Sequence, residues 1–154
     1  MQLWRICRQT HATGAFSGEG ARLYGGRWNS PGVGVIYTSP SLALAAIETF
    51  VHLEPDLQPD DLVSIRGEVP EDVTVQQIEL RSLPMDWYAA NHESLRVIGD
   101  RWASAGKTLA LRVPSAAIRG EWNMLLNPTH AEFGKIRIRR PVRFEFDRRM
   151  FRAR

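Results

Sequence analysis

The spacing of hydrophobic residues predicts more strands than helices along this chain. Short runs that are apolar throughout, or that alternate apolar and polar positions, are typical of strands; they occur at 3–6, 33–37, 62–69, 73–78, 108–113, 122–126, 135–138 and 142–146. Two longer segments, 40–53 and 91–105, carry apolar residues at helical spacing. Because these helices do not alternate regularly with the strands, the pattern predicts an α+β fold rather than a doubly wound α/β sheet.

The first of the two helical segments has the most informative pattern. Leu44, Ile47 and Val51 share one face, and Ser39 followed by Pro40 predicts an N-cap with proline in the first turn. Glu48 falls on or beside this apolar face. A carboxylate directed at a protein core is costly to bury unless it is paired or used in chemistry. This segment is therefore the first candidate for a functional site.

The second helical segment is predicted from its ends as well as its face. Asn91 is a suitable N-cap, Gly106 is a suitable C-terminal stop, and Leu95, Ile98 and Trp102 share the apolar face. Between the first helix and the next strand, prolines and aspartates at 55–61 predict a turn.

Length and composition indicate one folded domain spanning 1–154. Of the 154 residues, 44% are hydrophobic and 24% charged, so a disordered chain is not expected. Cys7 is the single cysteine, which excludes an intrachain disulfide, and its apolar surroundings predict a small core residue. The N-terminus lacks the apolar region of a signal peptide, and no apolar stretch is long enough to span a bilayer. A cytoplasmic protein without membrane contact is expected.

The net charge of +3 is modest, but arginines crowd the end of the chain. They are Arg137, Arg139, Arg140, Arg143, Arg148, Arg149, Arg152 and Arg154. Three interpretations stay open: a solvated basic surface, a docking surface for an acidic partner, and a nucleic-acid footprint.

Several common kinds of site are absent from the sequence. Its four histidines, His11, His52, His92 and His130, lack the short spacings of zinc ligands, so no metal site is predicted. At the end of the first helix, His52 is instead expected to interact with the helix dipole. There is no phosphate-binding Walker loop, no dinucleotide fingerprint of a Rossmann domain and no nucleophile elbow of a serine hydrolase.

Four candidates for chemistry remain, each with a plain structural alternative. Arg27, which follows two glycines, could be a surface cation beside a turn. Tyr37 could be a core aromatic, Glu48 a carboxylate that reaches solvent, and Ser115 a turn residue after proline. Composition and spacing leave these alternatives open.

Four motifs, in order and spacing, resemble the RES-domain toxins. They are GGRWNSPGVGVIYTS, LALAAIETFVHL, IGDRWASAGKTLALRVPSA and NMLLNPTHAEF. The resemblance covers residues 4–146, so that 147–154 would form a basic tail. By position in the motifs, it implies Arg27, Tyr37 and Glu48 as catalytic residues. The same matching implies that Arg27, Tyr37, Ser115 and, more weakly, Asn127 bind substrate.

The resemblance further implies a fold similar to that of the ADP-ribosyltransferases. This is a split mixed or antiparallel sheet with flanking helices around an NAD cleft. The implied chain is the toxin of a bacterial type II toxin–antitoxin pair, with NAD⁺ as its substrate and no separate cofactor. It would cleave the nicotinamide–ribose bond by hydrolysis or phosphorolysis and so arrest growth.

The implied partner is an Xre-type antitoxin with a helix-turn-helix DNA-binding domain, in a complex that can contain a toxin homodimer. Direct nucleic-acid binding by the toxin is not expected. The implied chemistry suits the residues: cleavage passes through an oxocarbenium-like state that a carboxylate can stabilise, and an arginine fork suits a pyrophosphate.

Two alternatives of function stay open. One is a protein ADP-ribosyltransferase toxin that uses NAD⁺ as donor, and the other is a non-catalytic nucleotide-binding module. Placing a carboxylate beside the anionic phosphates of a nucleotide favours catalysis, because a binding module would gain nothing from it.

Overall fold

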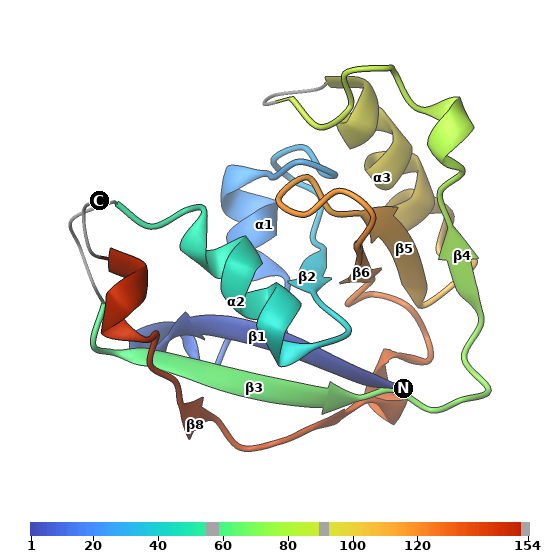
Figure 1. The fold of residues 1–154 in the computed structure, drawn as a ribbon. Coiled ribbons are helices and arrows are strands. Elements are labelled where there is room, and N and C mark those ends of the chain that lie inside the picture. Colours follow the sequence, from blue (N-terminus) through green and yellow to red (C-terminus); the bar gives the residue numbers. More distant parts are fainter. Residues whose placement is uncertain (55–58, 90–92, 152–154) are drawn as a thin grey trace.

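Two four-stranded sheets form the centre of the molecule (Figure 1). The computed structural model describes residues 1–54, 59–89 and 93–151. In the first sheet, β1 (Gln2–Arg8) pairs with β3 (Leu62–Glu68), which pairs on its other side with β7 (Arg137–Ile138) and β8 (Val142–Arg143). All of these pairings are antiparallel.

The second sheet is mixed. Its order is β2 (Ile36–Thr38), β6 (Trp122–Leu126), β5 (Ala110–Pro114) and β4 (Val75–Gln77). Strands β4 and β5 run parallel, and the other pairs are antiparallel. The predicted α+β class with a mixed or antiparallel sheet is therefore confirmed, and all eight predicted strands exist. Most are shorter than the sequence pattern predicted.

The two sheets join through a single bridge between their edge strands. The Trp4 amide donates to the Ser39 carbonyl over 2.7 Å, and the Ser39 amide donates to the Trp4 carbonyl over 2.9 Å. This bridge connects β1 to the end of β2, and neither strand pairs further with the other. The sheet is thus split, as expected, with the free edges of β1 and β2 beside each other.

Three α-helices flank the sheets. They are α1 (Glu19–Tyr24), α2 (Leu42–Phe50) and α3 (Glu93–Ala105). Short 3₁₀ turns occur at Gln9–His11, Leu80–Ser82, Phe133–Lys135 and Arg148–Phe151. The sequence did not predict α1, because only six residues form it and Gly18, in the left-handed region at φ 76°, takes the N-cap position.

Helix α2 begins later than predicted. Its N-cap is Ser41, whose hydroxyl oxygen accepts from the Leu44 amide over 3.1 Å. Ser39 cannot cap the helix because both of its backbone groups are used in the bridge to Trp4. The buried face also differs: Leu44 and Ala45 are buried, whereas Val51 is 54% exposed.

The buried residues form three clusters. The first lies between the two sheets and includes Leu3, Ile36, Ile65 and Leu126. The second packs α3 on the opposite face of the second sheet, and the third packs α2 on the outer face of the first sheet. Near the C-terminus, the rings of Phe144 and Phe146 join Phe50 and Phe151 in this third cluster, while the Phe144 amide still donates to the Leu62 carbonyl of β3 over 2.9 Å.

The face of α3 agrees with the prediction. Leu95 and Trp102 are buried and Ile98 packs against them. Gly106 follows the helix with φ 56°, a left-handed conformation that suits glycine. The predicted cap Asn91 lies outside the described residues, as do His92, Arg152, Arg154 and the first part of the turn at 55–58.

Gly99 of α3 lies where no side chain fits. A Cβ atom at this position would be 1.7 Å from the carbonyl oxygen of Trp28. We expect Gly99→Ala to lower the free energy of unfolding by about 3 kcal/mol or more, because the backbone of one segment must move. Gly20→Ala in α1 is the matched control, since a Cβ there meets no atom within 4 Å. It should stabilise by about 0.5–1 kcal/mol. Urea unfolding of both variants checks this, and equal stabilities would contradict it.

Candidate active site

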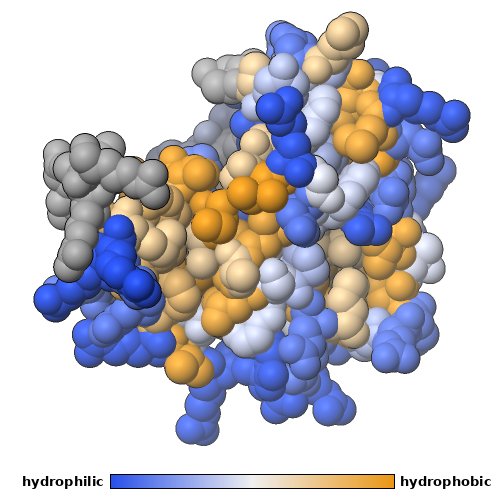
Figure 2. Space-filling view, in the orientation of Figure 1, coloured by the Kyte–Doolittle hydropathy of each residue, from blue (hydrophilic) through white to orange (hydrophobic). Residues whose placement is uncertain are grey.

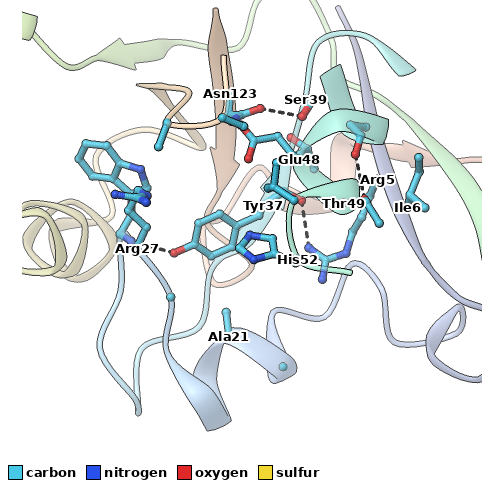
Figure 3. Close-up of a pocket in the computed structure, with 18 of the residues that line it drawn as sticks. Arg5, Ile6, Ala21, Arg27, Tyr37, Ser39, Glu48, Thr49, His52 and Asn123 are labelled. Atoms are coloured by element: carbon cyan, nitrogen blue, oxygen red, sulfur yellow. Dashed lines mark hydrogen bonds between the residues drawn. The ribbon is translucent and has the colours of Figure 1, made fainter. Parts of the chain in front are cut away.

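A cavity of about 1240 Å³ opens where β1 and β2 separate. One wall is strand β1 from Trp4 to Arg8, and another is α2 with the turn that follows it. The lining also includes segment 24–28, the end of β2, the end of β5 with the loop after it, the start of β6, and residues of α1 and α3. Figure 3 shows the side chains that these elements direct into it.

Glu48, from α2, has a fixed carboxylate. The Ser115 hydroxyl donates to its Oε1 atom over 2.6 Å, and the Asn123 side-chain amide donates to the same oxygen. Among the described residues no hydrogen bond reaches Oε2. Both donors thus hold the same oxygen of the carboxylate, and Glu48 is one of the residues that line the cavity.

The donors themselves are anchored in the second sheet. The Ser39 hydroxyl donates to the Asn123 side-chain carbonyl over 2.7 Å. Ser115 is fully buried, and its hydroxyl also accepts from the Ile118 amide over 3.0 Å. The carboxylate of a helix that packs on one sheet is therefore hydrogen-bonded to groups carried by the other. Asn123 was not predicted from the sequence, and Ser39 was predicted only as a helix cap, not as a residue of the site.

Tyr37 presents its ring, rather than its hydroxyl, to the cavity. The hydroxyl accepts from the Trp28 amide over 2.9 Å and donates to Asn29 Oδ1 over 2.8 Å. Burial raises the pKa of Tyr37 to about 12, so the hydroxyl stays protonated and can donate at neutral pH. Gly26 makes this possible, since a Cβ there would be 2.5 Å from the hydroxyl oxygen.

Arg27 lies near the hydroxyl end of Tyr37. Its NH1 group donates to the carbonyls of Trp87 and Ala89, over 3.2 and 2.7 Å. No hydrogen bond in the described structure involves its Nε or NH2 atoms, so most of the fork is free. Arg96 lines the same end of the cavity and donates to the Gly26 carbonyl over 3.3 Å.

Arg5 lies at the other end of Tyr37, and it was not among the site residues predicted from the sequence. Its NH1 group donates to the Tyr37 backbone carbonyl over 3.0 Å, while its buried Nε has no partner in the described structure. Burial lowers the pKa of this guanidinium. The sequence could have indicated Arg5 as a site residue, because it is a cation between Leu3 and Cys7 on the inward face of β1. Burial also raises the pKa of the Cys7 thiol, which agrees with a packing role for it.

The cavity lining is strongly cationic. Among the described residues it contains four arginines, Arg5, Arg8, Arg27 and Arg96, and one acidic residue, Glu48. Arg8 is paired with Asp61 over 2.8 Å, so the positive charge of the cavity comes mainly from Arg5, Arg27 and Arg96. An anionic ligand fits this balance.

The structure brings three of the five predicted site residues into the cavity lining, namely Arg27, Tyr37 and Glu48. Ser115 lies behind Glu48 and contacts its carboxylate. Asn127 lies apart: its amide donates to the Ala103 carbonyl of α3, and its Oδ1 accepts from the Thr129 amide and hydroxyl. Asn127 thus connects the end of α3 to the loop after β6, and it is not part of the cavity lining.

His52 lies two residues beyond the end of α2, exposed and in the cavity lining, rather than within the last turn of the helix. Among the described residues no three histidine, cysteine or acidic side chains come together as metal ligands. Within the same part of the chain, no helix is long and apolar enough to cross a membrane.

Comparison with known proteins identifies the family. Residues 2–147 match the RES domain. A "Prs ADP-ribosylating toxin" of Sphingobium sp. (strain YBL2) is 35% identical over 97% of this chain and 96% of its own length. A "Toxin Res" of Photorhabdus laumondii is 34% identical over 99% of both chains.

A solved structure shares the fold. The crystal structure of the M. tuberculosis MbcT–MbcA toxin–antitoxin complex matches with a TM-score of 0.72 at 20% identity, covering 94% of this chain and 84% of that one. The resemblance predicted from the four motifs is confirmed: this chain belongs to the RES domain family, whose curated relatives named here are toxins.

Proposed function

We propose that this chain is the toxin of a toxin–antitoxin pair and that it cleaves the nicotinamide–ribose bond of NAD⁺. The observation that carries the proposal is the carboxylate of Glu48, which is held by two donors and is the one acidic side chain among the described residues of a cavity whose lining also contains four arginines. NAD⁺ combines an anionic pyrophosphate with a sugar that becomes positive as the bond breaks. The arginines of the cavity complement the pyrophosphate, and the carboxylate of Glu48 complements the sugar.

Glu48 would act on the ribose. Bond cleavage passes through an oxocarbenium-like state whose positive charge a nearby carboxylate stabilises. Glu48 lines the cavity and its Oε1 is held by Ser115 and Asn123, so the charge would be oriented before substrate arrives. A preorganised charge contributes more than one that must reorient during the reaction.

The arginines would bind the pyrophosphate. Arg27 keeps Nε and NH2 free for a bidentate contact with phosphate oxygens. Between Arg27 and Glu48, the ring of Tyr37 would support the nicotinamide by stacking. Its hydroxyl is hydrogen-bonded to Trp28 and Asn29.

A second candidate is transfer of ADP-ribose to a protein. It is favoured by the name of the Sphingobium relative, an ADP-ribosylating toxin, at 35% identity. Both reactions share the cleavage step and differ only in the acceptor, which is water, phosphate or a protein side chain. Product analysis after incubation with NAD⁺, with and without phosphate and protein, distinguishes them.

An Xre-type antitoxin is the proposed partner. Hydrophobic side chains gather over the region of α2 in the space-filling view (Figure 2). At the mouth of the cavity, Tyr24 is 84% and Val51 54% exposed, so a partner covering this face would bury apolar surface and close the cavity.

The basic C-terminal region is less uniformly positive than the sequence suggested. Arg139 is paired with Glu68, Arg143 with Glu145 and Arg149 with Asp147. Among the described residues, Arg137, Arg140 and Arg148 have no ion pair. These three remain the candidates for steering an acidic partner.

Replacing Glu48 tests the catalytic role. Glu48→Gln is nearly isosteric, and its amide oxygen can still accept from Ser115 and Asn123. We expect NAD⁺ turnover to fall by about 10²–10³-fold, because the charge opposite the oxocarbenium-like centre is lost. Nicotinamide release measures this, with the exposed Glu71→Gln as control. Wild-type turnover in a folded Glu48→Gln protein would refute the role.

Replacing Arg27 by lysine tests the phosphate contact. Lysine keeps the charge but loses the fork, so KM for NAD⁺ should rise by about 10-fold or more while kcat changes less. Steady-state kinetics measures both constants. Arg22→Lys, in an exposed pair with Glu19, is the control and should leave them unchanged. Unaltered kinetics for Arg27→Lys would show that Arg27 does not contact substrate.

Charge reversal tests the partner surface. Arg140→Glu combined with Arg148→Glu should slow association with the cognate antitoxin and weaken its salt dependence, because exposed charges steer encounter and are screened over about 8–10 Å. NAD⁺ turnover by the free toxin should persist. Stopped-flow binding measures the rate, with exposed Arg81→Glu as control. Lost turnover with unchanged association would instead place this region at the substrate cavity.

A further inference from the structure

We propose that Asn123 is a positioning residue for Glu48 and that Ser39 holds Asn123 in the orientation this requires. The inference rests on the proposed function, since it concerns how the same carboxylate is directed at the ribose. It extends that function to two residues outside the predicted set, from β6 and from the end of β2.

The two oxygens of the Glu48 carboxylate are in different environments. Oε1 accepts from both Ser115 and Asn123, and no described residue donates to Oε2. A glutamate side chain has three rotatable bonds, and two donors on one oxygen from different elements restrict all of them. The unpaired oxygen is then directed at the cavity rather than averaged over many positions.

Only one orientation of the Asn123 amide supports this arrangement. Its NH₂ group faces Glu48 and its carbonyl oxygen faces the Ser39 hydroxyl, which donates over 2.7 Å. Rotating the amide by half a turn would set two acceptors, Asn123 Oδ1 and Glu48 Oε1, against each other. The Ser39 hydrogen bond adds to the preference for the productive orientation.

Ser39 is itself held by its surroundings. The residue is 3% exposed, and its backbone amide and carbonyl are both hydrogen-bonded to Trp4 of β1. Asn123 is held by strand pairing with Val113 of β5. The chain of contacts from Trp4 through Ser39 and Asn123 to Glu48 therefore connects the junction of the two sheets to the reacting carboxylate. Figure 3 shows Ser39, Asn123 and Glu48 together.

A positioning role has a kinetic signature. Loss of the Asn123 donor would release the carboxylate without removing a contact to NAD⁺, so kcat should fall while KM changes little. A displacement of about 1 Å at a reacting group can cost about 10²-fold in rate. A residue that bound substrate directly would mainly change KM instead.

Asn123→Asp is the sharpest variant. Aspartate has the same shape and keeps an acceptor for Ser39, but it replaces the donor to Glu48 by a repelling oxygen. We expect kcat to fall by about 10²-fold. Because the added charge also repels the anionic dinucleotide, KM for NAD⁺ is compared in the uncharged Asn123→Ser, where it should stay within about twofold of wild type. Asn123→Ser, which is shorter and uncharged, gives the same comparison if the aspartate variant does not fold; circular dichroism and thermal unfolding establish folding.

Ser39→Ala completes the test. It should lower kcat in the wild-type background and have no further effect in Asn123→Ser, because Ser39 acts only through Asn123. Ser64→Ala is the matched control: Ser64 is also buried in a strand, and its hydroxyl donates to the Val142 carbonyl away from the cavity lining. Its kinetics should equal those of wild type.

Wild-type turnover measured in parallel separates the two levels of the proposal. An inactive wild-type chain would overturn the proposed function itself. With an active wild type, unchanged kcat in folded Asn123→Asp, a rise in KM alone, or additive effects of Ser39 and Asn123 would each overturn the positioning role and leave the function standing.

Discussion

The carboxylate of Glu48 depends on hydrogen bonds that cross between the two halves of the fold. Helix α2, which carries it, packs on the outer face of the first sheet, whereas its donors Ser115 and Asn123 belong to the second. Removing a carboxylate from water costs free energy that hydrogen bonds offset, and Glu48 receives both of its hydrogen bonds at Oε1. The Trp4–Ser39 bridge that joins the sheets also anchors this network. The geometry of the site therefore follows from how the sheets meet.

The cavity also holds positive charge whose burial opposes folding. Among the described residues Arg5 Nε is buried and has no partner, and leaving a buried donor unsatisfied costs about 1–3 kcal/mol. Within the same part of the chain, Arg27 donates from NH1 only, to the carbonyls of Trp87 and Ala89. Unsatisfied cations beside a held carboxylate suit a ligand that brings both anionic oxygens and a centre of developing positive charge.

Local patterns predicted the elements better than the contacts between them. Alternation identified the strands, and helical spacing identified the buried face of α3, because both depend on near neighbours in sequence. The start of α2 was misplaced because Ser39 is used by Trp4, thirty-five residues away in sequence. Asn123 was missed for the same reason, since its partners lie on β2 and α2. Motif resemblance brought Arg27, Tyr37 and Glu48 together, yet it could not tell Asn127, which supports α3, from a cavity residue.

The most direct test is a crystal structure of the Glu48→Gln protein with NAD⁺ bound, since that variant should hold the uncleaved dinucleotide. We predict that the nicotinamide ribose lies within hydrogen-bonding distance of the residue-48 side chain, on the side away from Ser115 and Asn123. The pyrophosphate should contact the free fork of Arg27. NAD⁺ bound elsewhere, or with its nicotinamide ribose far from residue 48, would contradict the role of Glu48 in cleaving the glycosidic bond.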